Sequence, residues 1–426
     1  MNDMPFTERL IAGKSPEQLC AERAKRFEDA LALRQPDCIP IMMPASYFLA
    51  EYGGITHQEL QDNWEKAQEL LEKAALDFQP DAIFGLFNSP RPSLVLGDRM
   101  TKWPGHGLPP NGSFQFVEQE FMKAEDYDAF LRDPSDWALR TYVPRAFAKL
   151  EGLKLLPPFG LWAFGHYYLP NLATYAAPPV QEAFQALCQA IQLAAEDAAR
   201  MNESVQRLVT LGFPPHPLIG SIVEAPFDFM SDTLRGMRGI MLDIYRRPEK
   251  LLAAEERVLE IQLEYALNFA RTTGLKNCFI PLHRGSDGFM SLEQFERFYW
   301  PQLKELMVRL IENGIYPICF YEGIWDQRLH YLKELPPGKS AGWFQRSDIF
   351  KVKEVVGETM CIIGGMPNSL LQTGTVEEVR ECTRRLCEVV GRGGGFVMCT
   401  QIGEMEGCKP ELVRAWVEAT REFGVY

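Results

Sequence analysis

The 426-residue sequence lacks any run of about 18 apolar residues, and its first twenty residues lack the basic start and apolar stretch of a signal peptide. It contains ten cysteines, but no two of them form a Cys-x-x-Cys pair. Long chains without export signals usually keep their cysteines as reduced thiols. We therefore expect a cytoplasmic protein with free thiols and without a disulfide framework.

The sequence has no excess of positive charge, since its 44 lysines and arginines are outnumbered by 57 acidic residues and the formal net charge is −13. This sign disfavours surfaces that hold nucleic acid phosphates or anionic lipids, so we expect neither a nucleic acid partner nor a membrane partner. The sequence has no low-complexity block or long charge run of the kind that marks disorder. Its 46% hydrophobic content is enough to bury a large core.

Over the last 150 residues, short apolar segments alternate with segments of helical period. The expected strands there are 277–283, 316–322, 340–345, 359–366 and 394–400. Similar segments occur earlier at 37–45 and 81–87. Strands that show no alternation and are each followed by a helix predict a parallel sheet buried on both faces.

About eight such strands predict the α/β class, as a (β/α)8 TIM barrel with an N-terminal helical extension and loop insertions. We expect a single domain over residues 1–426, with a helical arm in residues 1–35. The alternative is an open doubly wound sheet, but no Gly-x-Gly-x-x-Gly motif follows an early strand.

In a parallel barrel the chemistry lies at the C-terminal ends of the strands, which selects three candidate residues. Glu322 ends one expected strand, where a carboxylate has few structural roles besides helix capping or a salt bridge. His283 ends another and is either a metal ligand or general base, or a hydrogen-bonded core histidine. Cys399 lies near the end of the last strand, although a lone cysteine in an apolar run is more often a core residue.

Aromatic and basic residues near the same strand ends form a second group of candidates. Such a lining would suit a planar substrate. The substrate-binding candidates are Tyr47, Tyr321, Trp343 and Arg346. For each aromatic residue the alternative is packing in the barrel interior or between helices.

Several longer segments resemble one known superfamily. They are GSDGFMSLEQFERFYWPQLKELMVRLIENGIYPICFYEG, CIIGGMPNSLLQTGTVEEV and GGGFVMC followed by KPELVRAWVEATREFG. Over nearly the whole chain, the sequence is similar to the uroporphyrinogen decarboxylase superfamily. The resemblance implies a (β/α)8 barrel and leaves two activities open, because the superfamily contains the decarboxylase of haem synthesis and cobalamin-dependent methyltransferases.

The decarboxylase of haem synthesis carries an arginine-rich N-terminal motif that holds the carboxylates of its tetrapyrrole. The matching segment here, IMMPASYFLAEYGG, contains neither arginine nor lysine. Because arginine supplies bidentate recognition of carboxylates, its absence argues against a porphyrinogen substrate. The resemblance is therefore nearer to the methyltransferase branch.

Thiol methyltransferases of that branch bind zinc through a His-x-Cys motif and a second cysteine after the last strand. At the matching positions this sequence has Phe320, Glu322 and Ile402, while Cys399 lies three residues before the last of these. If Glu322, His283 and Cys399 converge, they form a catalytic zinc site with an open fourth position. Such a set suits zinc as a Lewis acid on an ether or alcohol oxygen.

The resemblance thus predicts a methyltransferase that moves a methyl group from a small methoxylated compound, aromatic or not, to the cobalt of a separate corrinoid protein. No Asp-x-His-x-x-Gly cobalamin signature is present, so the cobalamin must be carried by that partner. A homodimer is left open. The alternatives are a metal-free decarboxylase or lyase that uses Glu322 and His283 as an acid/base pair, and a barrel without catalysis.

Overall fold

The computed structural model describes residues 11–86 and 89–426, so the start of the expected arm and the end of the expected strand 81–87 lie outside the described residues. The chain divides into two compact units. The sheet unit comprises residues 11–86 together with Glu203–Asp228 and Leu259–Tyr426. The insertion unit comprises residues 89–202 and Phe229–Val258.

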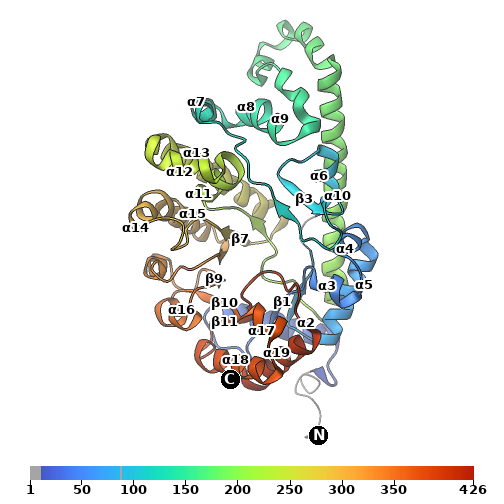
Figure 1. Ribbon diagram of the computed structural model, residues 1–426, viewed down its shortest axis with the longest axis vertical. Helices are drawn as coiled ribbons and strands as arrows, with labels where there is room; N and C mark the ends of the chain where they lie inside the picture. Colours follow the sequence, from blue (N-terminus) through green and yellow to red (C-terminus); the bar gives the residue numbers. More distant parts are fainter. Residues whose placement is uncertain (1–10, 87–88) are drawn as a thin grey trace. The chain divides into compact units, whose positions relative to one another are not determined.

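The sheet unit contains parallel strands, and all of them except β6 lie in segments that the sequence predicts as strands (Figure 1). They are β1 (Met42–Pro44), β2 (Ala82–Phe84), β6 (Ser221–Ile222), β7 (Asn277–Leu282), β8 (Tyr316–Tyr321), β9 (Ala341–Phe344), β10 (Cys361–Met366) and β11 (Phe396–Thr400). Strands β6 to β11 pair in chain order, β1 pairs with β2, and a parallel bridge from Ile41 to Met398 connects the two sets. The expected parallel α/β sheet is therefore confirmed.

An apolar cluster lies on one face of this sheet and includes residues from most of its strands. It contains Met42, Ala82, Phe84, Leu218, Ile318, Phe320, Ala341, Trp343, Cys361, Ile363, Val397 and Cys399. Leu218 precedes β6, at the end of the strand order opposite to β2, which supplies Ala82 and Phe84. Contact between the two ends of the order supports a closed barrel, although no ladder joins β2 to β6 in the described part of the chain.

Helices and short turns connect these strands. Those of the sheet unit are α2 (Pro16–Leu31), α3 (Phe48–Gly53), α4 (His57–Asp62), α5 (Trp64–Phe78), α11 (Pro226–Asp228), α14 (Leu292–Gln294), η7 (Phe295–Tyr299), α15 (Trp300–Glu312), η8 (Leu329–Glu334), α16 (Ile349–Val356), α17 (Asn368–Thr373), α18 (Val376–Arg385), η9 (Leu386–Val390) and α19 (Pro410–Phe423). Capping boxes are present at Ser291 and Thr375, and Asp348 caps α16. In the described residues, no helix combines the length and the apolar character that crossing a membrane requires.

Helix α2, from the expected N-terminal arm, covers the end of the sheet at which the strands begin. Its Phe27 and Ala30 join the apolar cluster. The hydroxyl of Tyr316, the first residue of β8, donates to the carbonyl of Leu31 at 2.8 Å. The C-terminal ends of the strands therefore lie at the other end of the sheet, away from α2.

A buried ion network ties α2 to the rest of the sheet unit. The fully buried Asp81 accepts from Arg26 and Arg421, each at 2.7 Å, and from the backbone N–H of Ile41 at 2.7 Å. Burial alone would raise the pKa of Asp81, but the charges of Arg421 and Arg26 outweigh burial and hold the pKa below its ordinary value. The carboxylate of Asp81 thus joins α2, the residue before β1 and α19.

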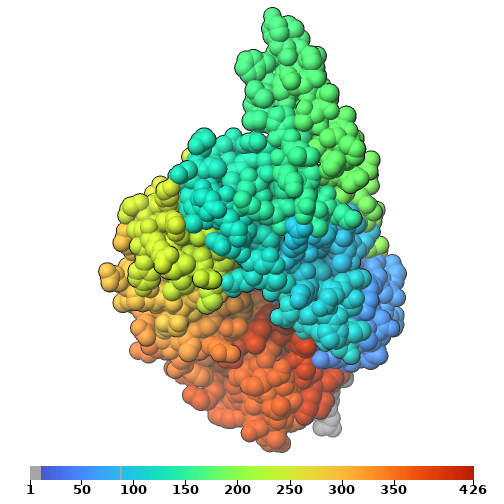
Figure 2. All heavy atoms as spheres, turned by 45° about the horizontal axis from the view of Figure 1, so that its top comes forward, coloured from blue at the N-terminus to red at the C-terminus, as the bar shows by residue number. Residues whose placement is uncertain are grey.

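The insertion unit is mostly helical and has its own core. Its elements are α6 (Pro90–Leu96), β3 (Thr101–Pro104), β4 (Gly107–Leu108), β5 (Gln115–Phe116), η1 (Ala124–Asp126), α7 (Tyr127–Arg132), α8 (Pro134–Trp137), η2 (Ala138–Tyr142), α9 (Val143–Ala146), η3 (Ala148–Leu155), η4 (Phe159–Tyr167), η5 (Leu169–Ala176), η6 (Phe229–Arg235) and α12 (Gly236–Arg246). Helices α10 (Pro178–Thr210) and α13 (Pro248–Thr273) contribute residues to both units. Leu150, Leu153 and Val180 form part of the unit's own core, and Figure 2 shows the atoms of this unit in teal, green and yellow-green.

We predict that Asp81→Asn lowers the free energy of unfolding by about 3–5 kcal/mol at neutral pH, because the buried Arg421 loses its carboxylate partner and Arg26 keeps only Asp37. The folded-state pKa of Asp81 is depressed, so this stabilisation is present above its ordinary pKa of about 3.8 and is lost as the pH falls through the lower folded value. Urea unfolding at neutral and acidic pH measures both effects. The exposed variant Glu388→Gln should unfold like the wild type, and equal behaviour of the two variants would contradict the network's role.

Candidate active site

His283 and Glu322 lie next to each other at the C-terminal ends of two paired strands. In the register of β7 and β8, Leu282 is opposite Tyr321, so the next residue of each strand follows at the same level. His283 Nε2 lies 3.6 Å from Glu322 Oε1, and the two side chains are 29% and 38% exposed. The structure thus brings together, at a solvent-accessible edge, the two residues that the sequence selects as catalytic candidates.

The backbone at His283 is held by a buried carboxylate, Asp228. Asp228 accepts from the backbone N–H groups of His283 and Arg284, both at 2.9 Å, and from the hydroxyl of Tyr299 at 2.5 Å. The side chain of Asp228 is fully buried, so these bonds are not exchanged with water. Asp228 therefore fixes the turn that presents the imidazole.

The backbone at Glu322 is held equally firmly by its neighbours. Its N–H donates to the carbonyl of Leu282 at 3.1 Å, and its carbonyl accepts from the indole N–H of Trp325 at 2.8 Å. The next residue, Gly323, has a φ of 74° and donates its N–H to Gln345 Oε1 at 2.8 Å. A left-handed glycine here lets the chain turn away immediately after the carboxylate.

The loops after β7 and β8 also pack closely against each other. A Cβ at Gly285 would lie 2.3 Å from the Trp325 ring and 2.5 Å from the Tyr299 ring. Asp287 accepts a hydrogen bond from the backbone N–H of Gln327 and forms an ion pair with the buried Arg328. This packing leaves His283 and Glu322 on rigid backbone rather than on a mobile loop.

Two of the expected substrate-binding residues, Tyr321 and Trp343, have packing contacts instead. Tyr321 is fully buried and stacks on Phe344 with 4.6 Å between ring centroids, and burial raises the pKa of its hydroxyl. Trp343 belongs to the apolar cluster, contacts Phe320 and donates its indole N–H to the carbonyl of Thr400 at 2.8 Å. Their assignment as substrate contacts stays a prediction.

The other two expected substrate-binding residues differ in exposure. Tyr47 is fully buried and stacks on His57 with 4.2 Å between centroids. Arg346 is exposed, and its backbone N–H donates to the carbonyl of Gly323, directly after Glu322, at 3.2 Å. Of these two residues, Arg346 is therefore the one whose backbone is hydrogen-bonded beside Glu322.

Cys399 lies in the apolar cluster with Phe320 and Trp343 and is fully buried. Burial raises the pKa of its thiol well above the ordinary value, whereas zinc binds the thiolate. Glu322, His283 and Cys399 do not form a cluster of three metal-binding atoms in the described part of the chain. Zinc binding by these three residues stays a prediction without a ligand cluster to support it.

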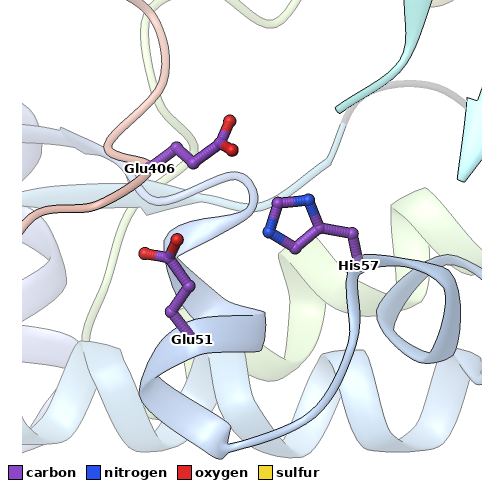
Figure 3. Close-up of side chains that lie close together, drawn as sticks. All are labelled: Glu51, His57 and Glu406. Carbon is purple, nitrogen blue, oxygen red and sulfur yellow. The ribbon is translucent and has the colours of Figure 1, made fainter. Parts of the chain in front are cut away.

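A different trio does form such a cluster. Within residues 11–86 and 89–426, Glu51, His57 and Glu406 each place one ligand atom within 4.8 Å of the others (Figure 3). None of these three residues is among the metal ligands predicted from the sequence. One feature of the sequence could have indicated Glu51. It lies in the helix that follows β1, near the C-terminal end of a strand, where barrel enzymes place their functional residues.

Comparison with known proteins agrees with this fold. The family model described as uroporphyrinogen decarboxylase (URO-D) matches residues 173–423. Among solved structures, a methyltransferase from Methanosarcina mazei has a TM-score of 0.57 and 15% sequence identity, with 94% of this chain and 98% of that chain covered. No curated protein matches the sequence. At this identity the structural likeness concerns the fold.

We predict that Asp228→Asn lowers the free energy of unfolding by about 1–3 kcal/mol, because an amide cannot accept from all three buried donors. Chemical unfolding measures the change. Asp326→Asn is the matched control, since Asp326 is partly exposed and its side chain accepts a longer bond of 3.3 Å from Asp348. Equal stabilities of the two variants would show that Asp228 does not hold the turn at His283.

Proposed function

Because the chain belongs to the uroporphyrinogen decarboxylase family, we propose that it is a methyltransferase on that family's (β/α)8 barrel. The proposed reaction moves a methyl group from a small methoxylated compound to the cobalt of a corrinoid on a separate protein. The match of the family model to residues 173–423 shows that the chain belongs to this family. The likeness to the Methanosarcina mazei methyltransferase supports the choice of activity.

The observation that carries the proposal is the pair formed by His283 and Glu322. A histidine and a carboxylate 3.6 Å apart, both partly exposed and on fixed backbone, can hold and transfer one proton. They lie where barrel enzymes place their reacting groups, at the C-terminal ends of the strands. Glu322 lies close enough to His283 to balance the positive charge of an imidazolium.

The pair would act on the oxygen of the methoxy group. When bound, the reduced corrinoid of the partner supplies the nucleophile that accepts the methyl group. The bond between the methyl carbon and the oxygen breaks, and its electron pair stays on the oxygen. His283 Nε2 donates its proton to that oxygen, so the second product leaves as a neutral alcohol or phenol.

The residues expected to bind zinc do not support a step through the metal. Glu322 and His283 are together, but Cys399 is a buried thiol in an apolar cluster, and the three form no ligand group. The proposed step therefore uses protonation by His283 in place of Lewis-acid activation. The catalytic roles of His283 and Glu322 do not depend on a metal in this account.

The substrate proposed is small and weakly charged. The segment 41–54, which includes β1 and α3, contains no arginine or lysine that could pair with several carboxylates. The net charge of −13 also opposes a polyanionic ligand. A methoxylated alcohol or arene meets both conditions, whereas a porphyrinogen meets neither.

A second candidate is decarboxylation of a small acid, which the description of the matching family favours. The same pair would then protonate the carbanion that remains after loss of carbon dioxide. The two candidates differ in their products, since one releases an alcohol or phenol and the other releases carbon dioxide. An assay that detects both products decides between them.

We predict that the purified protein demethylates at least one member of a panel of methoxylated alcohols and arenes when free cob(I)alamin is supplied. Formation of methylcobalamin is followed by absorbance, and the alcohol or phenol by chromatography. His283→Gln and Glu322→Gln should each reduce kcat by about 10²–10⁴-fold, the usual contribution of general acid catalysis.

The exposed variant Glu411→Gln is the matched control and should retain wild-type turnover. Unfolding temperatures of all variants show whether a loss of activity reflects loss of structure. Full activity in both His283→Gln and Glu322→Gln would overturn the roles proposed for the pair. Release of carbon dioxide from small acids without any demethylation would establish the second candidate.

A further inference from the structure

Glu51, His57 and Glu406 come from distant parts of the sequence and meet at one place in the sheet unit. Glu51 lies in α3, which follows β1, His57 is the first residue of α4, and Glu406 lies in the loop after β11. Strands β1 and β11 are neighbours through the bridge from Ile41 to Met398. The cluster therefore lies at the C-terminal end of the sheet, near the first and last strands.

The backbone around these three residues is fixed by hydrogen bonds. Gly407 donates its N–H to Glu51 Oε2 at 2.7 Å, and Gln372 Nε2 donates to the carbonyl of Glu406 at 2.7 Å. Gly407 has a φ of 74°, a left-handed conformation in which a side chain would be strained. The loop after β11 is thereby tied to α3 and to α17, with the Glu406 carboxylate held near Glu51.

His57 provides an observation that is independent of the two acids. The side chain is 3% exposed, and its buried Nδ1 atom has no hydrogen-bond partner among the described residues. Stacking on the buried Tyr47 fixes the plane of the ring. Figure 3 shows Nε2, the other nitrogen of this ring, on the side nearest Glu51, with the Glu406 carboxylate close by. A buried imidazole that presents Nε2 beside two carboxylates supplies the ligand types of a metal site.

The spacing is compatible with a bound cation. Ligand atoms about 2.1 Å from a tetrahedral zinc lie roughly 3.4 Å from one another. The three candidate atoms lie within 4.8 Å of each other, so small side-chain rotations would bring them to that distance. Glu51 is exposed and Glu406 is half-buried, which leaves one side of the cluster open to entry.

We propose that Glu51, His57 and Glu406 bind one divalent transition-metal cation, with zinc as the preferred ion. An imidazole favours zinc over calcium or magnesium, which prefer sites made only of oxygen ligands. The bound ion would connect residues near the first strand to a loop near the last one. It would thus stabilise the contact between α3, α4 and the loop after β11. This structural role is separate from the His283 and Glu322 pair and independent of methyl transfer.

The test is zinc titration of the full chain after removal of metals with a chelator. The wild type should bind about one zinc ion per chain, and its unfolding temperature should rise with zinc concentration because the ion binds the folded state. Glu51→Gln and Glu406→Gln, at accessible positions, should weaken binding at least tenfold and remove the thermal shift. His57→Gln changes a buried residue, so its zinc affinity is compared with the wild type only if the two proteins have the same unfolding temperature without metal.

Two control variants locate the ion. Glu411→Gln should bind zinc like the wild type, and so should Glu322→Gln, because neither residue belongs to the cluster. Loss of zinc in Glu322→Gln with retention in Glu51→Gln and Glu406→Gln would overturn the proposal and assign the metal to the other site. Absence of zinc binding by the wild type, or equal affinity for calcium and zinc, would also overturn it.

Replacement of zinc by cobalt(II) adds a spectroscopic test of the ligand types. A site of two carboxylates and one imidazole should show weak visible bands and no sulfur-to-cobalt charge-transfer band in the near ultraviolet. A strong charge-transfer band would reveal a cysteine ligand and contradict the proposed set. This readout does not depend on whether the protein transfers methyl groups.

Discussion

The arrangement of both polar centres depends on the parallel register of the sheet. Parallel strands all end at the same edge, and successive side chains on one strand point to opposite faces. The pairing of Leu282 with Tyr321 sets His283 beside Glu322, and alternation places Phe320, two residues before Glu322, on the same face, where it lies in the apolar cluster. A shift of one residue in the register would bury the carboxylate among the aromatic side chains. The apolar packing of the sheet therefore also determines where the reacting groups lie.

Much of the fold could be predicted from the sequence because buried parallel strands appear as short apolar runs between helices. The expected segments 277–283, 316–322 and 359–366 correspond closely to β7, β8 and β10. The division into two compact units was not predicted, because irregular segments give no periodic signal that shows which of them pack together. The strand β6 is only two residues long, too short for a reliable pattern.

The site was predictable only in part, and for a physical reason. Residues that end neighbouring strands must meet, which is why His283 and Glu322 could be chosen together. The orientation of Cys399 could not be inferred, since a strand buried on both faces shows no alternation of polar and apolar residues. The cluster of Glu51, His57 and Glu406 depends on contact between opposite ends of the chain, which no local pattern records. The family resemblance concerns the residue at the end of β8 and gives no signal for this second cluster.

The central claim is that His283 and Glu322 handle the oxygen from which the methyl group leaves. A crystal structure of the protein with a bound methoxylated compound tests this claim most directly. The account predicts that the ether oxygen lies about 3 Å from His283 Nε2 or from a carboxylate oxygen of Glu322, the distance needed for proton transfer. A compound bound with its ether oxygen far from both side chains, or held there by a metal ion, would contradict the account.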